Sequence, residues 1–253
     1  MNHSEFRDKI YSAYWEKHFS DYDWNTTDPD LFKRAALGYQ HNFGRHVDKF
    51  PAGARVLDVG CGIGHCLWWL RGKDFDVEGV DLDSGQLAQA EKMVPDDVEL
   101  VAADIFDHLA PAEAEYDIVI ANDMIEHLTR SEAIEFAELA YRGLKTGGVL
   151  LLKTPNAITP SAGRFYDDLT HERIYTYLSL RQLLRTANFE DVEVTSWESP
   201  PLRSPASVVS WVVRRVTWNL YKLRLMLHDF CPPPREVGQN LIAAATKTGE
   251  KTE

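Results

Sequence analysis

Short apolar runs and amphipathic stretches take turns along the middle of the chain, and they predict strands and helices in alternation. The apolar runs predict strands over residues 56–59, 75–80, 98–102, 116–121, 148–153, 190–197 and 240–246. Amphipathic spacing predicts helices over residues 65–72, 84–93, 130–145 and 179–188. The alternation from residue 54 to 154 is typical of an α/β fold with a parallel sheet and right-handed crossovers.

Two other segments depart from this alternation. Residues 1–50 predict a helical leader, with one stripe through Phe6, Ile10 and Tyr14 and a second helix over 30–47. Residues 200–236 predict a helical insertion that is bounded by proline clusters. We therefore divide the chain into an N-terminal helical leader or lid over 1–50 and one α/β domain over 51–253 that carries the insertion.

The insertion carries a basic amphipathic helix over residues 203–228. Apolar residues with three-four spacing form one continuous stripe on it: Val209, Val213, Val216, Leu220, Leu223 and Leu227. All its charged residues are basic, namely Arg203, Arg214, Arg215, Lys222 and Arg224. Such a stripe usually packs on its own domain or on a sister subunit, but a basic amphipathic helix can also lie on an anionic membrane. A peripheral membrane contact and a homodimer through residues 203–228 both stay open.

Residues 56–64 carry the strongest chemical signal. A strand that holds Asp58 opens into the turn Gly60-Cys61-Gly62-Ile63-Gly64, whose glycines let the backbone approach a ligand closely. The next strand ends on Asp81, where nucleotide-binding α/β folds place a ribose-binding carboxylate. His65 stands where the dinucleotide fingerprint needs its third glycine, and Asp58 disfavours a pyrophosphate. The pattern favours a cofactor with a positive centre, and an NAD-binding oxidoreductase is a lesser alternative.

These residues and four later stretches resemble the class I S-adenosylmethionine-dependent methyltransferases of the type-23 and type-11 kind. The later stretches are 101–105, 116–121, 122–128 and 144–151. The resemblance implies a Rossmann-like, mostly parallel seven-stranded sheet with helices on both faces and the last strand antiparallel beside the fifth. It also implies S-adenosylmethionine as the cofactor. The residues implied to bind it are Asp58, Gly60, Cys61, Gly62, Gly64, Asp81, Leu82, Asp104, Ile105 and Asn122.

Two histidines are candidate catalytic residues. Methyl transfer to a hydroxyl needs an aligned nucleophile and removal of its proton, and an imidazole suits proton removal near neutral pH. His171 follows the predicted fifth strand, at the edge where such sheets bind ligands, and we expect it to be the base. We expect His127, after the fourth strand, to shape the methyl end of the donor site. The predicted function is O-methylation of a small-molecule, glycan- or lipid-linked acceptor, with a non-catalytic S-adenosylmethionine-binding scaffold recruited through the 203–228 helix as the alternative.

The chain also looks similar to the ubiquinone-biosynthesis O-methyltransferases, whose acid-x-x-Glu-His pattern binds a divalent cation. The matching residues are Asp123, Glu126 and His127, and Asp123 is one methylene shorter than the glutamate usual in those enzymes. Hard cations generally need more oxygen ligands than this motif supplies. We therefore expect no metal, and these three residues as the ligands if one binds.

Composition narrows the setting. The chain has 253 residues and a net charge of −12, which disfavours general nucleic-acid binding because phosphate neutralisation needs a basic surface. Its three cysteines, Cys61, Cys66 and Cys231, lack metal-ligand spacing, and their odd number fits a reducing compartment. The polar first residues and the lack of a long apolar run predict neither secretion nor a membrane span. We expect a cytoplasmic protein, with a peripheral position on the inner face of a membrane as a further option.

Overall fold

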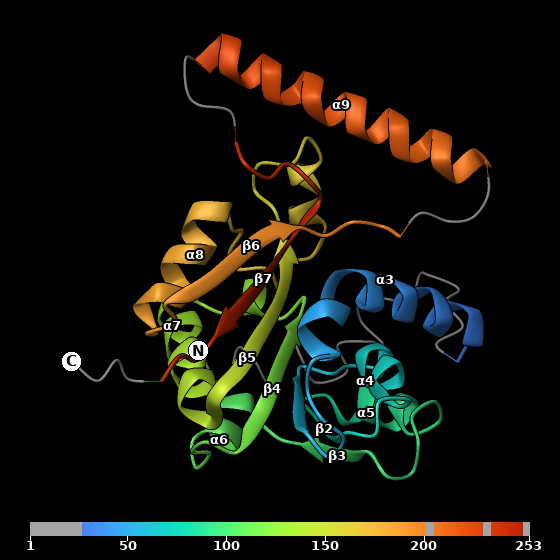
Figure 1. Cartoon of the computed structure of the whole chain (residues 1–253), viewed down its shortest axis with the longest axis vertical. Helices are drawn as coiled ribbons and strands as arrows, with labels where there is room; N and C mark the ends of the chain where they lie inside the picture. The colour runs from blue at the N-terminus through green and yellow to red at the C-terminus, as the bar shows by residue number, and fades with distance from the viewer. Residues whose placement is uncertain (1–26, 201–204, 230–233, 250–253) are drawn as a thin grey trace.

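A computed structural model describes residues 27–200, 205–229 and 234–249. Its centre is one seven-stranded sheet in the order β3-β2-β1-β4-β5-β7-β6 (Figure 1). The strands are β1 (Arg55–Val59), β2 (Asp76–Asp81), β3 (Glu99–Ala102), β4 (Tyr116–Asn122), β5 (Leu144–Pro155), β6 (Asp191–Ser196) and β7 (Asn240–Thr246). The pairs from β3 to β5 are parallel, whereas β7 runs antiparallel between β5 and β6. The predicted Rossmann-like sheet and its antiparallel last strand are therefore confirmed.

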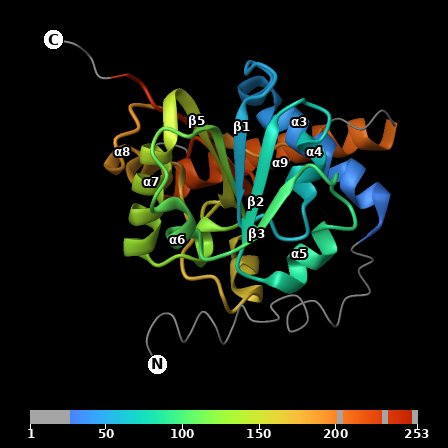
Figure 2. The same cartoon turned by 90° about the horizontal axis from the view of Figure 1, so that it is seen from below.

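Helices cover both faces of the sheet, as Figure 2 shows, with α3, α4 and α5 on one side and α6, α7 and α8 on the other. On the first side lie α3 (Pro29–Val47), α4 (His65–Leu70) and α5 (Ser84–Ala90). On the other lie α6 (Ile105–Leu109), α7 (Arg130–Gly143) and α8 (Tyr177–Thr186). Two short 3-10 turns, η1 (Ile125–His127) and η2 (Ala162–Asp167), follow β4 and β5, and α9 (Pro205–Asp229) connects β6 to β7.

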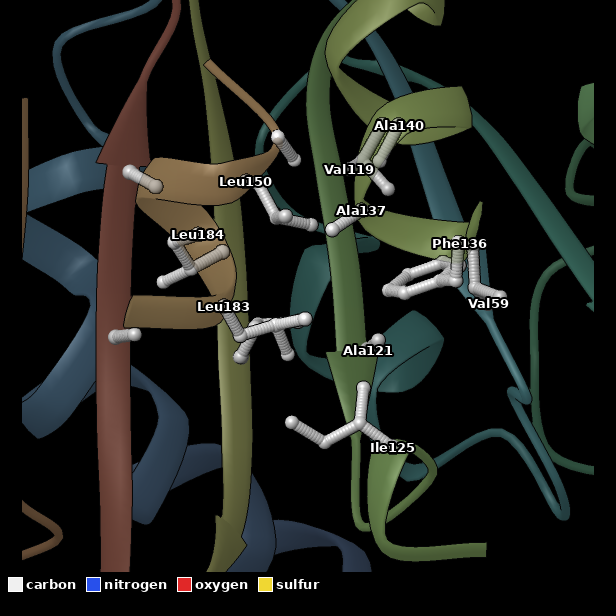
Figure 3. Close-up of a cluster of buried hydrophobic side chains, with 14 of the residues drawn as sticks. Val59, Val119, Ala121, Ile125, Phe136, Ala137, Ala140, Leu150, Leu183 and Leu184 are labelled. Atoms are coloured by element: carbon white, nitrogen blue, oxygen red, sulfur yellow. The ribbon is translucent and has the colours of Figure 1, made fainter. Parts of the chain in front are cut away.

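Successive side chains of a strand point to opposite faces of the sheet, so each strand contributes to two hydrophobic clusters, one beneath each layer of helices. On β4, Val119 and Ala121 join the cluster beneath α7 and α8, which Figure 3 shows with Phe136 and Leu184. Ile118 and Ile120 face the opposite way and join the cluster beneath α3 and α4. The central strands are apolar on both faces because both faces are buried, so their carboxyl ends are held in fixed positions.

The structure refines several predicted boundaries. Strand β5 begins at Leu144 rather than at 148, directly after α7 ends at Gly143. Helix α6 has only five residues and begins after an Asp104 cap, whose carboxylate accepts from the Phe106 amide at 2.8 Å. It was not predicted, because five residues are too few to establish a helical period.

The leader contributes one helix to the described residues. Asp28 caps α3 and Pro29 occupies its first turn, as the Asp28–Pro29 break predicts. Phe32 on α3 packs on the His65 ring of α4 with 4.5 Å between centroids, and Gly38 lets the Trp197 ring approach closely. The predicted stripe through residues 6–14 lies outside the described residues, and the division at residue 50 and the lid role stay predictions.

Helix α9 confirms a helical insertion between β6 and β7, and it lies apart from the other layers (Figure 1). Within the described part of the chain, no helix is both long enough and apolar enough to cross a membrane.

Candidate active site

The carboxyl ends of the parallel strands meet around a cavity of about 510 Å³. Its lining joins the turn after β1, the ends of β2 and β4, the start of α6 and the segments that follow β4 and β5. The sequence-predicted residues that line it are Asp58, Gly60, Cys61, Gly62, Asp81, Leu82, Asp104, Ile105, Asn122, Asp123, Glu126, His127 and His171. Gly64 is the one candidate outside this lining.

The glycine turn after β1 has the backbone that the sequence predicts. Gly60 and Gly62 have φ values of 67° and 53°, a left-handed region that favours glycine. A Cβ on Gly60 would lie 3.0 Å from the Met124 side chain, and one on Gly62 would lie 3.0 Å from that of Gln86. Gly64, with φ of 84°, is the N-cap of α4, and a Cβ there would meet Val94 at 2.9 Å. Gly60 and Gly62 therefore expose backbone to the cavity, whereas Gly64 allows the helix to pack.

Asp58 is the most strongly perturbed carboxyl group of the cavity. Its side chain is buried, and its Oδ2 has no hydrogen-bond partner among the described residues. Burial raises the pKa of Asp58 to about 8, and the negative charge of Asp81 adds to this shift. A cation placed beside Asp58 would reverse this shift by favouring the carboxylate.

Asp81 and Asp104 line the cavity at the ends of neighbouring strands. Asp81 accepts from the Gly62 amide through Oδ2 at 2.8 Å and from the Asp83 amide through Oδ1 at 2.9 Å. Burial raises the pKa of Asp81. Asp83 itself caps α5 by accepting from the Gly85 amide at 2.8 Å. These backbone bonds hold the Asp81 carboxylate against the glycine turn, where a diol of a bound ligand could meet it.

The cavity also brings both candidate histidines together. The rings of His127 and His171 lie 4.7 Å apart between centroids. His171 Nδ1 is 2.6 Å from the Phe165 carbonyl oxygen, which can only accept, so Nδ1 must carry the proton. This leaves His171 Nε2 as a proton acceptor at the cavity, with Asp168 Oδ2 3.9 Å away.

His127 belongs to a chain of hydrogen bonds. Its Nδ1 is 2.8 Å from Thr170 Oγ1, which in turn donates to Asp168 Oδ1 at 2.7 Å. Because the hydroxyl proton is used for Asp168, His127 Nδ1 must donate to Thr170. Burial, with the neighbouring His171 as a smaller cause, lowers the pKa of His127 to about 4. The imidazole of His127 is therefore neutral at pH 7, with its Nε2 unprotonated.

One group of side chains in the described structure could hold a metal ion. Its members are Glu126, His127 and His171, whose ligand atoms all lie within 4.8 Å of one another. Burial raises the pKa of Glu126 to about 8, and Thr154 donates to its Oε2 at 2.9 Å. Asp123 is not a member of this group, and its carboxylate pairs with Lys153. The structure thus puts His171 where the sequence pattern suggested Asp123.

The comparisons with known proteins agree with this architecture. A family model described as a methyltransferase domain matches residues 31–194. The chain belongs to this methyltransferase family. A probable S-adenosylmethionine-dependent methyltransferase of Mycolicibacterium smegmatis is 34% identical over 140 residues, which are 55% of this chain and 53% of that protein. A ubiquinone biosynthesis O-methyltransferase of Paraburkholderia phytofirmans is 34% identical over 110 residues, or 42% and 46% of the two chains.

The chain thus spans about half the length of these curated relatives. Among solved structures, a methyltransferase of Archaeoglobus fulgidus described as S-adenosylmethionine-dependent superposes with a TM-score of 0.63. That match covers 86% of this chain and 97% of the other at 23% identity, which shows the fold. Together with the family match, these relatives confirm the resemblance to class I methyltransferases and S-adenosylmethionine as the cofactor of the family.

The cavity of this chain fits such a cofactor. The glycine turn leaves space that a Cβ would fill, and Asp58 Oδ2 has no hydrogen-bond partner among the described residues. Four acidic side chains on successive strand ends favour a cationic ligand: Asp58, Asp81, Asp104 and Asp123. No phosphate-binding cation lines the cavity among the described residues. The side chains that line the cavity therefore suit a ligand with a sulfonium and an amino group rather than one with a pyrophosphate.

Several residues in or next to the cavity were not predicted from sequence. Tyr39 enters from α3 and Gln86 from α5. Asp168 and Thr170 form the hydrogen-bond chain to His127, although the sequence drew attention only to the neighbouring His171. A signal existed in the Asp-x-Thr-His spacing, because an aspartate often bonds to the backbone two residues on, as the Thr170 amide does here at 2.8 Å.

Proposed function

We propose that this protein transfers a methyl group from S-adenosylmethionine to a hydroxyl on a small-molecule, glycan- or lipid-linked acceptor. One observation carries the proposal. A single cavity runs from three strand-end carboxyl groups, Asp58, Asp81 and Asp104, to the paired rings of His127 and His171. Donor binding and proton removal can therefore take place at the two ends of the same space.

The carboxyl groups and the glycine turn would hold the donor. We assign Asp81 to the ribose hydroxyls, because backbone amides fix its carboxylate at the end of β2. Gly60 and Gly62 present backbone to the donor, and Asp58 would balance its positive charge. Asp104 and Ile105 begin α6 and would meet the adenine, while Cys61, Leu82 and Asn122 complete the walls.

The chemical demand on the protein is small. Bound S-adenosylmethionine supplies a methyl group on a sulfonium, which is already a good leaving group. The side chains of the cavity need to align the acceptor oxygen and exclude water, and one of them must take the hydroxyl proton. No covalent intermediate with the protein is required.

We assign proton removal to His171 rather than to His127. The carbonyl of Phe165 fixes the proton of His171 on Nδ1, so that Nε2 is ready to accept a second proton. The Asp168 carboxylate near Nε2 would stabilise the resulting imidazolium. His127 is the poorer acceptor, because burial lowers its pKa to about 4. Its bond to Thr170 suits a role in shaping the cavity.

A metal-assisted version of the same transfer is the second candidate. It is favoured by the proximity of Glu126, His127 and His171, and by the likeness to a ubiquinone biosynthesis O-methyltransferase. A cation bound there would occupy His171 Nε2 and could activate the hydroxyl directly. His171 cannot then act as the free base, so the two mechanisms predict different responses to chelators.

Two measurements test the proposal. Calorimetry should show binding of S-adenosylmethionine, and a tritiated-methyl assay on hydroxyl compounds and lysate fractions should show transfer that EDTA does not inhibit. Binding without transfer to any fraction would favour the scaffold alternative recruited through residues 203–228. Loss of transfer with EDTA and recovery with a divalent cation would favour the metal, and tight binding of NAD in place of S-adenosylmethionine would contradict both.

A further inference from the structure

Helix α9 exposes the side of a helix that proteins normally bury. The six residues of the apolar stripe are 45–65% exposed: Val209, Val213, Val216, Leu220, Leu223 and Leu227. Val212, beside the stripe, is 46% exposed. The sequence-based expectation that such a stripe packs on its own domain is therefore wrong for the described residues. At about 1.5 Å per residue, the 25 residues of α9 form a rod of roughly 37 Å with an apolar outer side.

Polar contacts hold α9 to the body of the protein, on a side of the helix that also carries Trp211 and Trp218. Arg215 pairs with Glu198 at 3.0 Å, Arg214 donates to Ser199 Oγ at 3.2 Å, and Lys222 donates to the Arg235 carbonyl at 2.6 Å. A polar cavity of about 640 Å³ separates this side of α9 from α3 and the end of β6. The orientation of the helix is thus fixed by ion pairs and hydrogen bonds, and it directs the stripe away from the body.

The charge of α9 selects the kind of partner. Helix α9 contains four basic side chains and one acidic side chain, Asp229 at its last position, so it carries +3 and the rest of the chain −15. Arg224 is exposed and lies one turn after Leu220, at the edge of the stripe. An apolar side with a long basic side chain at its edge, on a helix of net positive charge, is typical of helices that lie in the interface of anionic bilayers.

A second copy of the chain fits this surface less well. Two α9 helices packed stripe to stripe would place Arg224 of each copy at the edge of the contact, and the one acidic residue of α9, Asp229, lies at the end of the helix rather than beside it. An anionic lipid surface supplies negative charge and a continuous apolar layer at once. We propose that α9 docks the protein on membranes that contain anionic phospholipids, with the stripe inserted below the headgroups. This inference concerns α9 alone and does not rest on the proposed methyl transfer.

Vesicle flotation of the full-length protein tests the inference. We expect binding to phosphatidylcholine vesicles that contain phosphatidylglycerol, weaker binding to pure phosphatidylcholine, and weaker binding at high salt. The double variant Val216→Asp/Leu220→Asp should lower the bound fraction about tenfold or more, because two apolar side chains that would enter the bilayer become charged.

The matched control is Ser210→Asp/Thr217→Asp. Both residues are exposed on α9 and lie off the stripe, and the two substitutions change the net charge by the same amount. The control should keep most of the binding, while circular dichroism and S-adenosylmethionine titration verify that both variants fold. The inference is overturned if the unchanged protein ignores anionic vesicles or if the two variants lose binding equally. It is also overturned if light scattering shows a dimer that only the stripe variant disrupts, since the stripe would then bind a second copy.

Discussion

Replacing Asp58 by asparagine should change how the stability of the ligand-free protein depends on pH. The folded-state pKa of Asp58 is raised from 3.8 to about 8, mainly by burial, and the group is fully buried. A carboxyl whose pKa is raised in the folded state contributes stability below its unfolded pKa, and that stability is lost as pH rises toward the folded pKa. Between about pH 4 and pH 8, unfolding of the normal protein should therefore release one proton from Asp58.

The size of the effect follows from the shift. Four pKa units correspond to about 5 kcal/mol at roughly 1.4 kcal/mol per unit, an upper bound because the structure can relax around the charge. The amide introduced by Asp58→Asn does not ionise. As the pH rises from about 5 to about 8, the unfolding free energy of the normal protein should therefore fall steadily relative to that of Asp58→Asn. Urea unfolding at several pH values measures this difference.

A matched control isolates the buried site. Asp107→Asn removes an exposed carboxyl group from α6 and should leave the pH dependence nearly unchanged. Glu126, whose pKa is also raised to about 8, contributes to the pH dependence of all three proteins and therefore cancels in the comparison. Parallel stability curves for Asp58→Asn and the normal protein would refute the reasoning, because they would mean that Asp58 is ionised and solvated in the folded state.

Three further outcomes are expected. Asp81→Ala should weaken S-adenosylmethionine binding by about 1.5–3 kcal/mol in calorimetry, the scale of charge-assisted hydrogen bonds, and unchanged affinity would remove Asp81 from the site. His171→Ala should lower turnover at least ~100-fold while donor affinity stays within a few-fold, and a larger loss in His127→Ala would reverse the two assignments. Thr170→Val should lower the unfolding free energy by roughly 1–3 kcal/mol, because the hydrogen bonds of the Thr170 hydroxyl with His127 Nδ1 and Asp168 Oδ1 are lost, and Thr170→Ser should recover most of it.

The sheet could be predicted from the sequence because its strands lie between two helical layers. Burial on both faces makes β1, β4 and β5 nearly continuous apolar runs, as in Ile118 to Ala121, and such runs are visible without any tertiary information. The position of the antiparallel β7 between β5 and β6 came from the family resemblance. No pattern within residues 240–246 distinguishes an antiparallel central strand from a parallel one.

The cofactor-binding part of the candidate site could also be predicted from the sequence, because its residues lie at or just after the ends of strands that the apolar runs predict. Asp58 and Asp81 lie at the ends of adjacent parallel strands, so their meeting at one edge follows from the fold class alone. The part of the site around His127 and His171 is formed by irregular segments, whose course cannot be predicted from a hydrophobic pattern. Thr170 reaches His127 across 43 positions of the chain through a turn after β5, and only the folded structure fixes that path.

The orientation of α9 shows a different limit of sequence reasoning. The stripe from Val209 to Leu227 is evident from spacing, but spacing identifies only a side of the helix and not what that side contacts. The deciding information is the set of polar contacts that Arg214, Arg215 and Lys222 make with the body. Because the side of α9 that carries these cations makes its contacts within the chain, the apolar stripe stays exposed and available to a partner. An amphipathic pattern that usually indicates burial in a core here indicates an external surface.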